Sequence, residues 1–157
     1  MKIDKRLLVV CIAISVLTGV IAGILTGGGM ESFEMINKPL LSPPAWLFPV
    51  VWTILYVLMG ISSYLVLNAG KPQEQTGDAL RIYIVQLAVN FLWPFLFFGL
   101  EWYLFAFVWL VLLWILVLVM IIMFKDISKM AAYLNIPYLI WLTFAGYLNF
   151  AIWIFNR

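Results

Sequence analysis

Histidine is absent from the 157-residue chain, and cysteine occurs only once, at Cys11. Imidazole and thiolate groups are the usual protein ligands of zinc, copper and haem iron, and the carboxylates of this chain do not cluster at ligand spacing. We therefore predict that the protein holds no bound metal and no resident cofactor. A single cysteine also excludes a disulfide within the chain.

Charged residues are scarce, at 10% of the chain, whereas 66% of the residues are hydrophobic. An ordinary soluble domain is about 25% charged and about 45–50% apolar. Nine Lys or Arg and seven Asp or Glu cannot cover a globular core with a polar shell, so the surrounding solvent must be lipid. The net charge of +2, without any basic run, excludes nucleic acid as a partner.

Five apolar segments are long enough to cross a membrane as helices. We predict an all-α fold, an integral membrane bundle of five transmembrane helices in a single domain, residues 1–157. Ser42 is expected to cap the second helix, with Pro43 at its first position. The first segment is too long for a signal peptide and lacks a clear cleavage site, so we expect it to stay as a span. The predicted spans are about 7–26, 44–67, 79–98, 103–124 and 131–155.

The basic residues fall unequally on the two faces that five spans create. By the positive-inside rule, the richer face lies in the cytoplasm, which places the amino terminus inside and the carboxyl terminus outside. The richer face carries Lys2, Lys5, Arg6, Lys71, Arg81, Lys125 and Lys129, and the other carries Lys38 and Arg157.

Aromatic, amide and small residues recur at helical spacing on three spans, whereas no charged residue lies deep in any span. Pumps, ion-coupled carriers and voltage sensors usually need such a charge, which argues against all three. Where the stripes meet, aromatic faces and amides would suit a flat, mainly apolar ligand. The stripes are Pro49, Trp52, Tyr56 and Ser63; Gln86, Asn90, Trp93 and Phe97; and Tyr138, Trp141, Ala145 and Leu148.

Two features of these spans allow more than one interpretation. The amides of Gln86 and Asn90 can either bind a ligand or form hydrogen bonds between helices without any ligand. Pro94 interrupts the ladder of backbone hydrogen bonds near Asn90, and a kink of the helix there would widen a pocket. Small residues recur every four positions on the first span and fit close packing either within the bundle or across a homodimer, of which we favour the homodimer. They are Ser15, Gly19, Gly23 and Gly27.

Three ordered motifs resemble those of the translocator protein or tryptophan-rich sensory protein family (TspO/MBR, peripheral benzodiazepine receptor). They are KPLLSPPAWLFPVVWTILYVLMG at 38–60, QLAVNFLWPFLFF at 86–98 and PYLIWLTFAGYLN at 137–149. The resemblance implies a five-helix bundle, commonly dimeric, whose ligand cavity opens near the first loop and is lined by the second, third and fifth spans.

The resemblance also implies ligands, namely protoporphyrin IX and related tetrapyrroles, synthetic isoquinoline or benzodiazepine-type compounds and, in animals, cholesterol. The family's cholesterol motif is broken here, because Phe150 stands where a Tyr is needed and Arg157 lies further on. This favours a bacterial cytoplasmic membrane. The ligand-binding candidates are Phe33, Trp52, Tyr56, Asn90, Trp93, Trp141, Ala145 and Leu148 by motif, with Gln86, Phe97 and Tyr138 added from the stripes.

We interpret the chain as a membrane receptor or sensor of porphyrins. The alternative from the enzyme class is light-dependent degradation of protoporphyrin IX, in which Trp52 and Trp141 would be catalytic. Such a reaction needs no acid–base pair, because the porphyrin itself absorbs the light. Passive transport of tetrapyrroles or sterols is a third hypothesis, and an oligomeric scaffold is a fourth.

Overall fold

The computed structural model describes residues 3–27 and 29–157, which form helices and no strand. Within this range five helical stretches are long and apolar enough to cross a membrane, so the predicted five-span bundle is confirmed. The elements in chain order are α1 (Lys5–Leu25), α2 (Gly29–Met35), α3 (Leu47–Leu67), α4 (Gln73–Pro94), the π-helix η1 (Phe95–Gly99), α5 (Tyr103–Ile127), α6 (Lys129–Leu134) and α7 (Ile136–Phe155).

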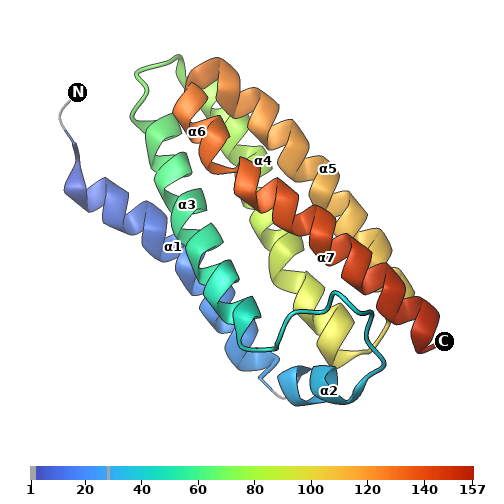
Figure 1. Cartoon of the computed structure of the whole chain (residues 1–157). Helices are drawn as coiled ribbons and strands as arrows, with labels where there is room; N and C mark the ends of the chain where they lie inside the picture. The colour runs from blue at the N-terminus through green and yellow to red at the C-terminus, as the bar shows by residue number, and fades with distance from the viewer. Residues whose placement is uncertain (1–2, 28) are drawn as a thin grey trace.

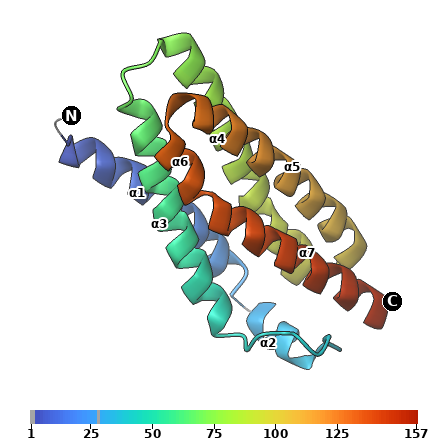
Figure 2. The same cartoon turned by 45° about the horizontal axis from the view of Figure 1, so that its top comes forward.

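The spans pack side by side into one bundle (Figure 1). Helix α1 packs against α3 and α4, α5 packs against α4 and α7, and α6 completes the ring by contacting α3. Beyond α6, helices α3 and α7 diverge, so their far ends are well separated (Figure 2). The short helix α2 lies below the bundle at this divergent end (Figure 1).

The second span begins later than the sequence predicts. Helix α3 starts at Leu47 with Trp46 as its N-cap, not at residue 44 behind a Ser42 cap. The backbone of Ser42 instead bonds to the carbonyl of Pro39 (3.0 Å) in a turn. A residue that precedes a proline is disfavoured in the α conformation, and consecutive prolines follow Ser42. The helix therefore cannot form until the chain has passed both of them.

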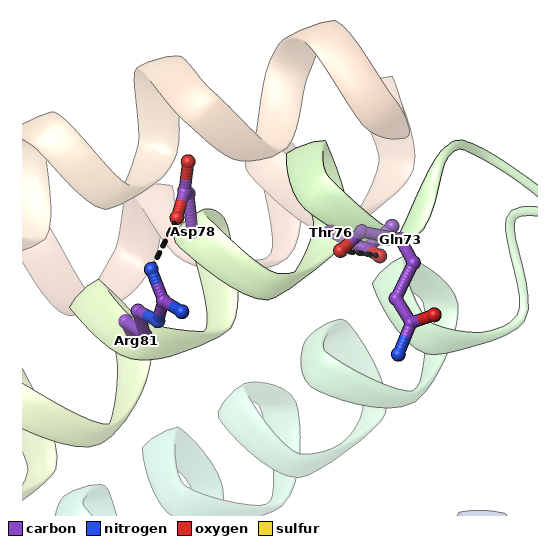
Figure 3. A network of polar contacts seen from close by, with 4 residues as sticks. All are labelled: Gln73, Thr76, Asp78 and Arg81. Carbon is purple, nitrogen blue, oxygen red and sulfur yellow. Dashed lines mark hydrogen bonds and ion pairs between the residues drawn. The ribbon is translucent and has the colours of Figure 1, made fainter.

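The third span extends further toward its amino end than its apolar run. Helix α4 begins at Gln73 rather than at residue 79, and its first turns are polar (Figure 3). Arg81 and Asp78 form an exposed ion pair of 2.8 Å, and the Thr76 hydroxyl donates to the carbonyl of Gln73 at 3.2 Å. The backbone hydrogen bonds of a helix do not depend on apolar side chains. The helix can therefore continue beyond the apolar segment that hydropathy detects.

The third span ends, and the fifth begins, with an irregular turn. Pro94 ends the α-helical part of α4, and the chain continues as η1, in which the Leu100 amide donates to the carbonyl of Phe95 (2.9 Å). In the fifth span, Asn135 separates α6 from α7, and the Asn135 side-chain amide donates to the Ser62 hydroxyl (2.6 Å). Pro137 follows this break, and it has no amide hydrogen with which to continue the backbone hydrogen bonds of α6.

Candidate functional site

A chain of polar side chains crosses the centre of the bundle. The Tyr56 hydroxyl donates to Asn90 Oδ1 (2.6 Å), and Asn90 Nδ2 donates to the Tyr138 hydroxyl (2.5 Å). The Tyr138 hydroxyl donates to Gln86 Oε1 (3.0 Å), and Gln86 Nε2 donates to the Met59 sulfur (3.8 Å). All five residues are buried. Both amides thus bond between helices, which was one of the two interpretations of their spacing.

A cavity of about 260 Å³ lies beside this polar chain, between α1, α3 and the end of α4. The candidates Trp52, Tyr56, Asn90 and Trp93 line it, and the rings of Trp52 and Tyr56 are 5.7 Å apart. Its walls combine indole, phenol and phenyl groups with one amide, and none of the described residues that line it is charged. The remaining lining residues are Val16, Gly19, Val20, Ala22, Gly23, Thr26, Gly27, Phe48, Pro49, Thr53, Pro94 and Phe98.

The candidates Phe33, Phe97, Ala145 and Leu148 do not line this cavity. They surround a void of only about 20 Å³ between α2 and the bundle. A void of this size holds at most a single water molecule. Three aromatic residues line both spaces and therefore form the partition between them. They are Phe48, Trp93 and Phe98.

Three further candidates lie outside both spaces. Gln86 and Tyr138 belong to the buried polar chain, behind Asn90. The Trp141 ring packs against Phe48, with ring centroids 5.9 Å apart. Its indole nitrogen is buried and has no hydrogen-bond partner among the described residues. Trp141 therefore supports a wall residue instead of forming the wall.

The sequence interpretation missed the contribution of α1, which forms one whole side of the cavity. The signal was the ladder of small residues. The Ser15 hydroxyl donates to the carbonyl of Tyr56 (2.7 Å), Gly19 lies against the Tyr56 ring, and Gly23 and Gly27 line the cavity. Close packing within the bundle thus accounts for the first half of the ladder. The homodimer stays a prediction, as does the absence of a bound metal.

Comparison of the sequence with known proteins places this chain in a family. The sequence model of the TspO/MBR family matches residues 9–154. The tryptophan-rich protein TspO of Chlorobaculum tepidum is 40% identical over 120 residues, which cover 76% of each chain. The protein CrtK of Rhodobacter capsulatus is 40% identical over 124 residues, 79% of this chain and 78% of that one. The human translocator protein is 37% identical over 128 residues, 81% of this chain and 76% of that one.

Proposed function

Because the chain belongs to the TspO/MBR family, we propose that it is a membrane receptor for porphyrins such as protoporphyrin IX, and for synthetic isoquinoline or benzodiazepine-type molecules. The observation that carries this proposal is the cavity between α1, α3 and α4. Flat indole and phenol faces suit the stacking of a planar ligand, and the Asn90 amide can orient a polar group.

The size of the cavity defines how such a ligand would fit. Ligand pockets usually measure about 300–1,000 Å³, so a volume of about 260 Å³ is at the lower limit. A tetrapyrrole needs more room than this. The partition of Phe48, Trp93 and Phe98 separates the cavity from the void next to α2, so rotation of these side chains would join the two spaces. We therefore propose that binding displaces part of this partition.

The light-dependent alternative now depends on Trp52 more than on Trp141. Trp52 lines the cavity, whereas Trp141 is in contact with the lining residue Phe48. A porphyrin in the cavity would meet the Trp52 ring directly. Photo-oxidation in this cavity would therefore fail without Trp52, and Trp141→Phe would act only through the shape of the wall.

The test is a titration of the purified protein with protoporphyrin IX in the dark, followed by illumination in air. Saturable quenching of tryptophan fluorescence is expected for the wild type, and the fractional quenching should be smaller in Trp52→Phe. Trp153→Phe is the matched control, because Trp153 lies near the carboxyl end of α7 and does not line the cavity. An unchanged porphyrin spectrum after illumination supports the receptor. A new product spectrum that requires Trp52 supports the enzyme. Absence of saturable binding contradicts both.

We also propose that the protein lies in a bacterial cytoplasmic membrane with its amino terminus inside. Among the described residues, Lys5, Arg6 and Lys71 are exposed on the amino-terminal face together with Arg81, Lys125 and Lys129. Labelling of whole cells with an impermeant maleimide should modify Glu34→Cys and spare Glu74→Cys, in a Cys11→Ser background. The reverse pattern would contradict this orientation. The homodimer is tested by cross-linking in the membrane.

A further inference from the structure

Helix α1 and helix α3 touch at one level of the bundle and separate at the next. At Gly19 a methyl group would lie 2.1 Å from a ring carbon of Tyr56, so the two helices are in direct contact there. At Gly23, one turn later, a methyl group would meet no atom within 4 Å. The seam between α1 and α3 is therefore closed at Gly19 and open at Gly23.

The open part of the seam coincides with exposed residues of the cavity lining. Five lining residues are exposed: Val20, Gly23 and Gly27 on the α1 side, and Pro49 and Thr53 on the α3 side. The lining residues from α4, by contrast, are buried or half-buried. Gly23 and Thr53 belong to membrane spans, where an exposed position faces lipid. Because the seam is closed at Gly19 and open at Gly23, the cavity has a mouth on the side of the bundle, between Gly23 and Gly27 on the α1 side and Pro49 and Thr53 on the α3 side.

The chemistry of the mouth limits what can pass through it. Among the described residues no charged side chain lines the cavity or its mouth. The two threonine hydroxyl groups of the lining already donate to their own helices: Thr26 to the carbonyl of Ala22 and Thr53 to that of Pro49, both at 2.7 Å. The mouth extends to the helix ends, because α1 ends at Leu25 and α3 begins at Leu47. One end of the mouth is thus apolar, and the other reaches the membrane surface.

We propose that ligands enter the cavity sideways from the bilayer, through the mouth between Gly23–Gly27 and Pro49–Thr53. The class of ligand is a flat, apolar molecule with its polar groups on one edge. The polar edge can stay at the membrane surface while the apolar ring system passes between the helices. This inference rests on the proposed function, since it concerns the same cavity. It adds the route, the residues that gate it and the shape of molecule admitted.

The test measures binding rates in lipid vesicles that contain protoporphyrin IX, by rapid mixing and tryptophan quenching. Gly23→Leu should project a side chain into the mouth, and its Cβ atom would clash with nothing, because no atom lies within 4 Å of that position. We expect association and dissociation both to slow by at least about tenfold, which ~1.4 kcal/mol of added barrier produces. Thr53→Leu blocks the mouth from its other side and should slow both rates as well.

The matched control is Ile24→Leu, at the next position of α1, where the side chain is 73% exposed and does not line the cavity. Its rates should equal those of the wild type, and a thermal unfolding curve establishes that each variant is folded. Wild-type rates in Gly23→Leu, with saturable binding, would overturn the lateral route and leave the receptor intact. Faster dissociation with unchanged association would also overturn it, because Gly23 would then act as a contact and not as a gate. Absence of binding by the wild type would instead refute the proposed function, and the route with it.

Discussion

Asn156, after the end of α7, is joined to the backbone of Asn37 by two hydrogen bonds. The Asn37 amide donates to Asn156 Oδ1 (3.1 Å), and Asn156 Nδ2 donates to the carbonyl of Asn37 (2.9 Å). These bonds tie the segment after α2 to the far end of the chain. They hold the first loop across the divergent ends of α3 and α7, over the void that Phe33 helps to line.

Replacing Asn156 should loosen this loop without unfolding the bundle. In Asn156→Ala we expect faster hydrogen exchange at the Asn37 amide, and a loss of stability of less than about 1 kcal/mol because the bonds are exposed. Asn68→Ala is the control, because Asn68 follows the last turn of α3 at the opposite end of the bundle, as Asn156 follows the last turn of α7. If entry is lateral, the porphyrin association rate stays at the wild-type value in Asn156→Ala. A faster rate would assign the entrance to the loop.

The contact between α1 and α3 should make Gly60 intolerant of any side chain. A methyl group there would lie 2.5 Å from the Ile12 Cα and 2.7 Å from the Ser15 hydroxyl, and the backbone of α1 cannot move aside locally. We expect Gly60→Ala to lower the free energy of unfolding by about 1–3 kcal/mol. Gly146→Ala is the control, since its nearest neighbour would be Leu110 Cδ2 at 3.8 Å, an ordinary contact. Equal thermal stability of the two variants would contradict the packing described here.

Removing the Tyr138 hydroxyl should leave two buried side-chain amides without one of their hydrogen-bond partners. It accepts from Asn90 and donates to Gln86, so Tyr138→Phe leaves one buried donor and one buried acceptor unpaired. We expect a loss of about 1–2 kcal/mol in thermal unfolding. Tyr147→Phe removes a hydroxyl from the same helix at a residue that is 46% exposed, and should be nearly neutral. A neutral Tyr138→Phe would mean that the polar chain contributes no net stability.

Removing part of the partition should lower the stability of the protein and raise its affinity for the ligand. Phe48→Ala joins the cavity to the void next to α2. It should lower the free energy of unfolding by about 3 kcal/mol, the lower end for a buried phenylalanine, because Phe48 already borders two spaces. The enlarged space should bind protoporphyrin IX more tightly than the wild type does. Phe124→Ala is the control: that side chain is fully buried and lines neither space, so stability falls without a gain in affinity. Weaker binding by a folded Phe48→Ala would contradict the proposed displacement of the partition.

The spans and the polar core were predictable because each rests on a local pattern. Runs of apolar residues mark a membrane helix, and the helical spacing of Tyr56, Asn90 and Tyr138 put these residues on stripes that the structure brings together. The late start of α3 was missed because the Ser42 cap signal outweighed the effect of the prolines that follow it. Helix α2 has only seven residues and too little periodicity to detect.

The position of the cavity was not predictable in the same way. Trp141 shares a helical stripe with Tyr138 and Ala145, but whether a stripe residue reaches the cavity depends on the tilt of α7 against α3, which no local pattern encodes. The wall from α1 was missed because it is made of small residues, which carry no aromatic or polar signal. Glycine at Gly19 and Gly23 has the same appearance in sequence, and only the packed structure separates a contact from an opening.

The contrast between Gly60 and Gly23 has an evolutionary consequence. A mutation at Gly60 is penalised by the framework itself, so that position can hardly vary without compensating changes in α1. A methyl group at Gly23 would meet empty space, so that position can vary without the clash that Gly60 imposes. Selection can therefore change which molecules this scaffold admits by altering one residue at the mouth, while the helices that support it stay as they are.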